Sequence, residues 1–190
     1  AGATLATGTG QGLRAWDILT GTARPLSEAH QRWVIAIAMD SAGSTMATGA
    51  VSGGLLRDPS SGARSGPALP HGLSVWDIAF DRSGHLVATA SEDRKGWLWD
   101  RASGYLVGPP MVHESAVMST EFLPDGRTIV TSSRDGGVRV WRVPDTSYRA
   151  DRMRARTRLA IGERLTPTGA IEPLSSDEMR ELASTLGPGR

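Results

Sequence analysis

The chain has 190 residues, a hydrophobic content of 39% and a formal net charge of +1, which is typical of one globular domain or slightly more. The near-neutral charge gives no reason to expect nucleic acid or an acidic membrane as the main partner. The absence of cysteine excludes disulfides and thiolate metal sites and leaves the compartment open. No apolar run approaches the roughly 20 residues that span a bilayer, and no signal-like start is present.

The first residues have the pattern of a sequence that starts inside a structural unit. Ala1 stands in a strand-like segment, and no initiator methionine precedes it. Arginine is frequent, whereas Lys95 is the only lysine, a bias that suggests a GC-rich, bacterial genome. We therefore expect the C-terminal end of a longer bacterial protein.

An internal repeat decides the predicted fold, because a fixed period is the signature of repeat architectures. His30, His71 and His113 are spaced by 41 and 42 residues. Four further columns keep these offsets: Val34, Val75 and Val117; Met39, Phe80 and Phe122; Gly43, Gly84 and Gly126; and Thr48, Thr89 and Thr131. Two columns extend back to the start of the chain. The threonine column begins with Thr7, which aligns with Thr48 and Thr89, and the Trp-Asp column contains Trp16-Asp17, Arg57-Asp58 and Trp99-Asp100. Trp141 closes the last copy.

Each copy has the pattern of short strands separated by turns. An apolar first strand is followed by a turn such as Pro124-Asp125-Gly126, whose residue types favour a hairpin. A second strand follows, a third carries the tryptophan, and a weaker fourth comes last. Examples are Val34–Met39, Val75–Phe80 and Val117–Phe122 for the first strand, Gly96–Trp99 and Val138–Trp141 for the third, and Tyr105–Val107 for the fourth. Four short strands in about 40 residues are typical of a propeller blade.

These motifs carry a resemblance to a known family. The string with His113, Val117, Phe122, Pro124-Asp125-Gly126, Thr131, Asp135 and Trp141 resembles a bacterial WD40 repeat, and the copy from His71 to Asp100 does so as closely. The resemblance covers residues 1–143 and implies an all-β fold, a partial WD40 β-propeller of about three and a half four-stranded blades with a short C-terminal helical tail. Leu56-Arg57-Asp58 departs from the expected Trp-Asp. The first two copies also lack the aspartate that matches Asp93 and Asp135, so we expect them to be less rigid.

The same resemblance implies a structural hydrogen-bond network, in which a turn aspartate holds the imidazole and a hydroxyl carries the bond to the indole. Its members would be His71, Thr89, Ser91, Asp93 and Trp99 in one copy, and His113, Thr131, Ser133, Asp135 and Trp141 in the next. An active site of the Ser-His-Asp type needs one nucleophile beside one base, whereas this set recurs once per copy. We therefore predict no catalytic residues and no cofactor. No metal site is expected either, since the histidines lack ligand spacing, and Gly8–Gly12 reads as a hairpin turn rather than a phosphate loop.

The tail, residues 144–190, leaves the repeat and is expected to hold two helices. Residues 149–165 read as an arginine-rich helix whose basic side chains form a solvated face, in preference to a nucleic-acid or lipid contact. Ser175 and Glu178 have the spacing of a capping box at the start of the second helix. That helix would present an apolar face formed by Met179, Leu182 and Leu186.

Residues 166–174 are similar to the tail that follows WD40 arrays in planctomycete-type serine/threonine kinases. The chain itself contains no kinase motif. This second resemblance gives an alternative function, a regulatory or sensor segment of a bacterial receptor-like kinase. The compartment stays open: the sequence favours the cytoplasm only slightly, and attachment to a membrane-anchored kinase would place the chain outside it.

An incomplete propeller leaves two apolar blade faces open, because each blade buries its faces only against its neighbours. Three explanations compete. A truncated sequence is favoured by the start within a blade. Self-association through the open faces comes second, since ends with unmatched strand counts would join poorly. A cap formed by the tail helices over one open face comes third.

The WD40 resemblance implies a rigid scaffold that presents its loops to other proteins and has no catalytic activity of its own. We expect contacts on the loops before each first strand, at residues 31–33, 72–74 and 114–116. The candidate partner-binding residues are Arg32, Trp33, Glu92, Arg94 and Arg134. Trp33 and Trp76 are expected to pack more than to bind. The rival from another class is a propeller enzyme whose active site lies in blades outside this chain.

Overall fold

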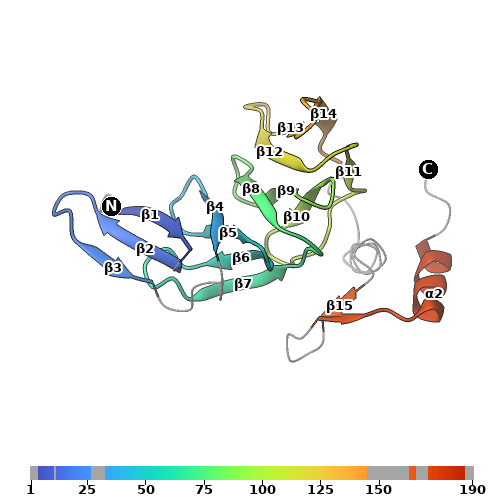
Figure 1. Ribbon diagram of the computed structural model, residues 1–190, viewed down its shortest axis with the longest axis horizontal. Coiled ribbons are helices and arrows are strands. Elements are labelled where there is room, and N and C mark those ends of the chain that lie inside the picture. The colour runs from blue at the N-terminus through green and yellow to red at the C-terminus, as the bar shows by residue number, and fades with distance from the viewer. Residues whose placement is uncertain (1–3, 11, 27–32, 145–162, 166–170, 187–190) are drawn as a thin grey trace.

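The computed structural model describes residues 4–10, 12–26, 33–144, 163–165 and 171–186. Strands β1 to β14 form four antiparallel sheets that follow one another along an arc (Figure 1), and we call these sheets blades 1 to 4 in chain order. Blade 1 comprises β1 (Thr4–Thr9), β2 (Gly12–Asp17) and β3 (Ala23–Pro25), and blade 2 comprises β4 (Val34–Met39), β5 (Met46–Ala50), β6 (Gly53–Arg57) and β7 (Arg64–Leu69). Blade 3 comprises β8 (Val75–Phe80), β9 (Leu86–Ser91), β10 (Lys95–Asp100) and β11 (Met111–Val112), and blade 4 comprises β12 (Val117–Phe122), β13 (Thr128–Ser133) and β14 (Val138–Arg142).

The described strands make two complete blades and two incomplete ones. Blades 2 and 3 have four strands each, whereas blades 1 and 4 have three each in the described part of the chain. Thr7 of β1 matches Thr48 of β5 in the repeat, so the strands described for blade 1 correspond to β5, β6 and β7, and no described strand corresponds to the inner strand β4. Up to residue 144, where the description of blade 4 ends, no strand corresponds to the outer strands β7 and β11. The predicted fold class, a partial propeller of about three and a half blades, is confirmed.

The outer strand of blade 3 lies further along the chain than predicted. Within the predicted strand Tyr105–Val107, Leu106 forms only an isolated bridge with Trp99. The outer strand is β11, which pairs with Lys95 and Gly96. The interruption falls at residues 108–110, where two prolines, which have no N–H to donate to a ladder, follow a glycine with φ of +79°.

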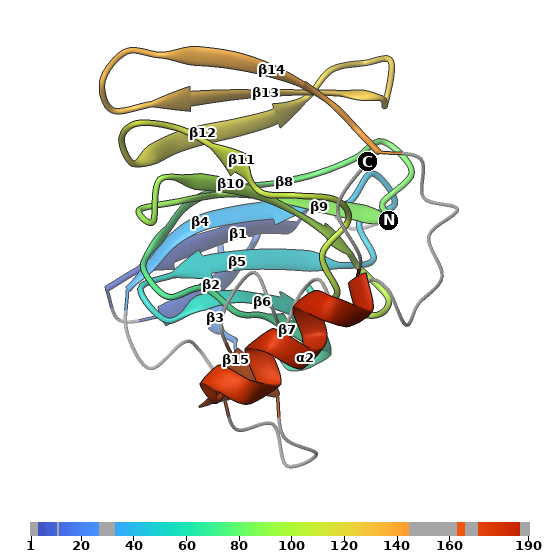
Figure 2. The same ribbon diagram turned by 90° about the vertical axis from the view of Figure 1, so that its right-hand side faces the viewer.

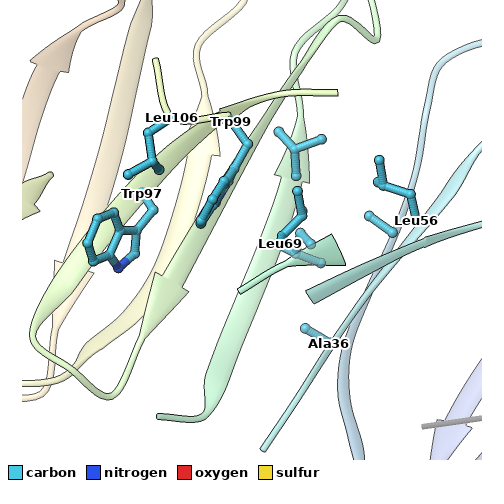
Figure 3. Close-up of a cluster of buried hydrophobic side chains, with 9 residues drawn as sticks. Ala36, Leu56, Leu69, Trp97, Trp99 and Leu106 are labelled. Carbon is cyan, nitrogen blue, oxygen red and sulfur yellow. The ribbon is translucent and has the colours of Figure 1, made fainter. Parts of the chain in front are cut away.

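The hydrophobic core lies between blades rather than within any one of them. Trp97 and Trp99 of β10 pack with Leu56 and Leu69 of blade 2 (Figure 3). Leu98 of β10 belongs to the cluster between blades 3 and 4, because alternate side chains of a strand point to opposite faces. A third cluster joins blades 1 and 2. Each blade is therefore stabilised mainly by its neighbours.

The antiparallel register gives each blade two opposite ends, because β8 begins opposite the end of β9 and ends opposite its beginning. At one end, which we call the histidine end, His71 and His113 precede the inner strands β8 and β12. At the other end, the aspartate end, Asp40 and Asp81 follow the inner strands β4 and β8, and Asp100 ends β10. The two ends therefore present different side chains to solvent.

The tail contains a short hairpin and one described helix (Figure 2). β15 (Glu163–Leu165) pairs with β16 (Ile171–Pro173), and α2 spans Ser176–Leu186. Residues 163–165 were expected to end the first tail helix and form a strand instead, because their backbone groups pair with β16. Residues 149–162 of that expected helix lie outside the described residues.

The predicted capping box at the start of α2 is confirmed. Ser175 N–H donates to Glu178 Oε2 at 2.8 Å, and Glu178 N–H donates to Ser175 Oγ at 3.3 Å. In the expected apolar face Met179 is half-buried, while the side chains of Leu182 and Leu186 lie outside the description. Figure 1 shows α2 apart from the four blades. A cap formed by both tail helices was the third of the three explanations for the open faces, and residues 149–162 of the first of these helices lie outside the described residues. No described helix is long and apolar enough to cross a membrane.

Candidate functional site

In blade 3 a chain of hydrogen bonds runs from an indole to a backbone carbonyl. Trp99 Nε1 donates to Thr89 Oγ1 at 3.0 Å, and Thr89 Oγ1 lies 2.8 Å from His71 Nε2. The second ring nitrogen, His71 Nδ1, lies 2.8 Å from the carbonyl oxygen of Leu69. Trp99 and Thr89 belong to blade 3 and Leu69 ends the outer strand of blade 2. The chain of bonds therefore joins two neighbouring blades.

The hydrogen-bond partners fix where the proton of His71 lies. A carbonyl oxygen can only accept, so Nδ1 carries the proton and donates to Leu69. Nε2 then accepts from the hydroxyl of Thr89, whose oxygen accepts from Trp99. Burial lowers the pKa of His71 to about 4, while the bond to Leu69 and the charge of Asp93 act in the opposite direction. The imidazole is therefore neutral at pH 7.

Blade 4 repeats the arrangement at its histidine end. His113 Nε2 lies 2.7 Å from Thr131 Oγ1, which accepts from Trp141 Nε1 at 2.7 Å. Burial lowers the pKa of His113, the positive charge of Arg139 adds to this effect, and Asp135 opposes it. Among the described residues, Nδ1 of His113 has no hydrogen-bond partner. Blade 4 thus lacks the last bond of the blade 3 chain.

The turn aspartates bond differently from the expectation that they hold the imidazole. Asp93 accepts from the indole Nε1 of Trp97 and from the N–H of Lys95, each at 3.0 Å. Its own N–H donates to Ser91 Oγ at 3.3 Å. The Nδ1 position of His71 is taken by a backbone carbonyl, so Asp93 acts on the imidazole through its charge alone.

In blade 4 the turn aspartate bonds within its own turn. Asp135 accepts from the hydroxyl of Ser133 and from the N–H of Gly137, the latter at 3.0 Å. These hydrogen bonds, led by that from Ser133, hold the pKa of Asp135 below its usual value. Both aspartates therefore shape the turn between the second and third strands.

Blades 1 and 2 also place a donor on the threonine of the repeat. Trp16 Nε1 donates to Thr7 Oγ1 at 2.8 Å. In blade 2, which lacks the tryptophan, Arg57 Nε donates to Thr48 Oγ1 at 3.3 Å, and Arg57 Nη1 donates to the carbonyl of Gly62 at 2.7 Å. Arg57 is only 1% exposed. The sequence reading treated Arg57 as a departure from the motif and missed that its guanidinium replaces the indole, which its place in the tryptophan column could have indicated.

The burial of these groups limits what they can do chemically. Thr89 and Thr131 are 0% and 1% exposed, so a substrate cannot reach either hydroxyl. Nucleophilic catalysis needs a hydroxyl that contacts the substrate beside a base and an oxyanion site. The arrangement is instead suited to holding two strands and a loop together, because each buried threonine hydroxyl is bonded to both a histidine ring and an indole. Within the described ranges, no three histidine, aspartate or glutamate side chains are grouped as metal ligands.

The histidine end of blades 3 and 4 places the candidate partner-binding residues beside the candidate loops. Glu92 N–H donates to the carbonyl of Ser74 at 2.9 Å, and Ser74 Oγ donates to the Glu92 carboxylate at 2.7 Å. Arg134 N–H donates to a carbonyl of the loop before β12 at 2.8 Å. The carbonyl of Arg94 accepts from the N–H of His113 at 2.9 Å. The turns and loops of this end are thus tied together by their backbones.

Arg94 has an unusual backbone conformation. Its φ is +70°, and the equivalent residue of blade 4, Gly136, has φ of +84°. The left-handed conformation costs a residue with a Cβ roughly 1–2 kcal/mol. The side chains of Arg94 and Arg134 are exposed, and neither guanidinium makes a hydrogen bond or ion pair with any described residue. Both groups therefore face solvent unpaired.

The two tryptophans before and at the start of the first strands, Trp33 and Trp76, differ in how far they are exposed. The Trp33 ring lies over Gly10 of blade 1 but is 65% exposed, so its expected packing is limited to that contact. Trp76 is half-buried at a register shift near the start of β8, and its buried Nε1 has no partner among the described residues. Arg32 lies outside the described residues. Trp33 is therefore an exposed aromatic at the edge of the surface, and Trp76 is largely a packing residue.

Comparisons with known proteins agree with this architecture. The family model described as WD domain, G-beta repeat matches residues 68–100 and 109–142, and such repeats are typical of scaffolds for protein–protein interaction. A search of the curated proteins gives no match. Among similar solved structures is the crystal structure of the computationally designed Ika4 protein, which is 24% identical, with a TM-score of 0.64 over 76% of this chain and 88% of that chain. At this identity the likeness shows the fold alone. The WD domain, G-beta repeat model therefore matches two repeats of this chain, residues 68–100 and 109–142, and the four described blades form part of a β-propeller.

Proposed function

We propose that the chain is a scaffold for protein–protein interaction without catalytic activity of its own, and that its contact surface lies at the histidine end of blades 3 and 4. This contact surface consists of residues 72–74 and 114–116 with Glu92, Arg94 and Arg134. The matched WD40 repeats support the general role. Short loops on stacked blades keep chemically different side chains in fixed relation, which suits recognition of a protein surface.

The observation that carries this proposal is Arg94, an arginine at a position that favours glycine. Its left-handed backbone destabilises the turn relative to the glycine found at the same place in blade 4. Its guanidinium makes no hydrogen bond or ion pair with the described residues, so no polar contact within the fold accounts for an arginine here. A strained residue with an unused functional group indicates a functional role. Arginine is also one of the residues that contribute most to protein interfaces.

The buried network beneath the surface supports the same role. His71 and Ser74 lie in the same loop, which precedes β8. The bonds of His71 to Thr89 and Leu69 fix this loop and thereby position Ser74. Ser74 in turn binds Glu92 through its hydroxyl and its carbonyl. The network therefore positions the contact surface, which reduces the conformational entropy that a partner must remove on binding.

The test is affinity capture with the whole chain and two variants, Arg94→Gly and Arg134→Ser, followed by affinity measurement on each captured protein. We expect both variants to weaken binding of at least one partner by tenfold or more, roughly the effect of a hot-spot residue. Arg94→Gly should at the same time stabilise the fold, which separates a contact role from a structural one. Arg14→Ser, at an exposed arginine of blade 1, is the matched control. If every partner bound all four proteins equally, the contact surface would be misplaced.

A further inference from the structure

A groove opens at the aspartate end between blades 3 and 4, on the side of the blades opposite the contact surface proposed above. Its volume is about 820 Å³, which lies within the range of ligand sites. Arg127, Arg142 and His85 line it together with Asp81 and Asp100, and Val143 contributes to an apolar part of the wall. The groove therefore combines charged and apolar groups, none of which belongs to the buried network.

The groove exists because a contact that closes the preceding junction is missing here. Between blades 2 and 3, Arg101 Nη1 donates to Asp40 Oδ2 at 3.3 Å and to Thr45 Oγ1 at 2.9 Å. The repeat offsets of 41 and 42 residues place Val143 at the position of Arg101 in the next junction. A valine can neither span the junction nor pair with a carboxylate. The space that a guanidinium fills in one junction is therefore open in the next.

The unpaired groups in the groove are hydrogen-bond donors. Arg127 and Arg142 are exposed, and neither guanidinium makes a hydrogen bond or ion pair with the residues that the structure describes. Arg142 occupies the column in which the other copies have Asp17, Asp58 and Asp100. Blade 4 therefore has a positive charge where the other three blades have a negative one.

The carboxylates of the groove are already engaged by their own turns. Asp81 accepts from the N–H of Leu86 at 2.7 Å, and it also accepts from the N–H and the hydroxyl of Ser83. Asp100 accepts from the N–H of Ser103 at 2.8 Å and from its hydroxyl at 2.6 Å. The oxygens of these carboxylates are thus engaged by hydrogen bonds within the fold. The guanidinium of Arg142 has no partner among the described residues, and that of Arg127 interacts with the carboxylate of Asp125 through its charge, without a hydrogen bond.

A cationic occupant that imitates Arg101 fits less well. The second acceptor of Arg101, the hydroxyl of Thr45, has Leu86 as its counterpart in this junction. A cation near Asp81 would also be repelled by the free guanidinium of Arg142. The complementary occupant is an anion with an apolar neighbour.

We propose that the groove binds a short acidic segment of a partner protein. The guanidinium groups of Arg127 and Arg142 bind its carboxylates through paired N–H donors, a geometry for which arginine is suited. The half-buried Val143 and Pro144 take an adjacent apolar side chain of the segment. Because the groove and the contact surface lie at opposite ends of the blades, binding at one can be lost without loss at the other.

The test measures the fluorescence anisotropy of a short labelled peptide that alternates glutamate and leucine, titrated with the whole chain. Arg127→Gln and Arg142→Gln should each weaken binding about tenfold, the effect of losing a charged hydrogen-bonded pair. Arg14→Gln, on blade 1, should leave it unchanged. Val143→Arg places a guanidinium where it can reach Asp81 as Arg101 reaches Asp40, so this variant should abolish binding by closing the groove. Far-UV circular dichroism and urea denaturation establish that each variant is folded.

Several outcomes would overturn the proposal. These are equal binding of a peptide with glutamine in place of glutamate, unchanged affinity in both arginine variants, unchanged affinity in Val143→Arg, or no binding by the unaltered chain up to about 1 mM peptide. Full displacement of the peptide by equimolar inorganic phosphate would indicate a simple anion site and would also overturn it. The Arg94→Gly variant should bind the peptide normally, which keeps this test independent of the contact surface at the histidine end.

Discussion

Blades 2 and 3 place different donors on the same buried hydroxyl. In blade 3 the indole of Trp99 donates to Thr89, and in blade 2 the guanidinium of Arg57 donates to Thr48. The indole has a single donor and a large apolar ring, whereas the guanidinium has several donors, one of which reaches the carbonyl of Gly62. The comparison shows that the repeat preserves the bond to the hydroxyl while the surrounding contacts change from aromatic packing to further hydrogen bonds.

Among the described residues, blade 2 has no equivalent of the aromatic surroundings of Trp99; His30, which matches His71 in the repeat, lies outside the described residues. The ring of His71 lies 5.2 Å from that of Trp99 and the ring of Trp97 lies 6.1 Å from it, measured between centroids. In blade 2 the position of Trp97 is held by Leu55, which pairs with Thr48 as Trp97 pairs with Thr89. Aromatic pairs add stability beyond the area they bury. We therefore expect blade 3 to depend on its donor residue more strongly than blade 2 does.

The largest expected effect is that of Trp99→Ala. Trp99 is fully buried between blades 2 and 3, so its loss leaves a cavity and removes the indole donor. We expect the free energy of unfolding to fall by about 3–5 kcal/mol, measured by urea denaturation with far-UV circular dichroism. Val140→Ala, at an exposed position of β14, should change stability by less than about 0.5 kcal/mol. A loss for Trp99→Ala as small as that of the control would show that the junction does not depend on the indole.

Acid should weaken blade 3 through His71. The pKa of His71 is about 4 in the folded chain, against an ordinary value of 6.5, so the unfolded chain takes up this proton first as the pH falls. The contribution of His71 to stability is therefore present above pH 6.5 and is lost as the pH falls to about 4, a change of about 3 kcal/mol. Urea denaturation at a series of pH values measures it.

Two variants isolate the histidine responsible for the acid effect. His71→Asn should remove most of this pH dependence, although it lowers the stability at pH 7. His85→Asn, at an exposed histidine of the aspartate end, should leave the dependence unchanged. An unaltered slope in His71→Asn would show that other groups cause the acid effect.

In blade 2, Arg57→Ala should cost less than Trp99→Ala. It leaves the hydroxyl of Thr48 and the carbonyl of Gly62 without this donor, and we expect a loss of about 2–3 kcal/mol. Arg57→Trp restores the donor to Thr48 that the other blades use and should recover part of the loss. Thermal and urea denaturation of the two variants measure the difference. If Arg57→Trp were the less stable of the two, the guanidinium would have a role that an indole cannot take.

The fold could be predicted because it repeats. The spacing of His30, His71 and His113 fixed the period, and the Thr and Trp columns placed the second and third strands where the structure has them. The capping box of α2 was also readable, because Ser175 and Glu178 act locally. A repeat period and a capping box can be predicted from one sequence because both depend on residue spacing along the chain and not on contacts between distant residues.

The details of the site were harder to predict because they depend on which groups meet across blades. The acceptor for His71 Nδ1 is a backbone carbonyl of the preceding blade, and a backbone acceptor leaves no signal in residue identity. The groove depends on Val143 failing to repeat the contact of Arg101, which becomes visible only once the junction between blades 2 and 3 is known. The left-handed backbone of Arg94 is similarly evident only from its φ.

The smallest expected effect is that of removing the threonine hydroxyl that accepts the donor in each blade. Removing it in blade 3 and in blade 2 compares the two blades directly. Thr89→Val keeps the shape of the side chain but leaves Trp99 Nε1 and His71 Nε2 without their shared partner, at a cost of roughly 2 kcal/mol. Thr48→Val should cost about 1 kcal/mol, because Arg57 keeps its bond to the Gly62 carbonyl. Urea denaturation of both valine variants gives the difference. Equal losses would mean that the second acceptor of the guanidinium adds nothing, and that the two blades depend on this hydroxyl to the same degree despite their different donors.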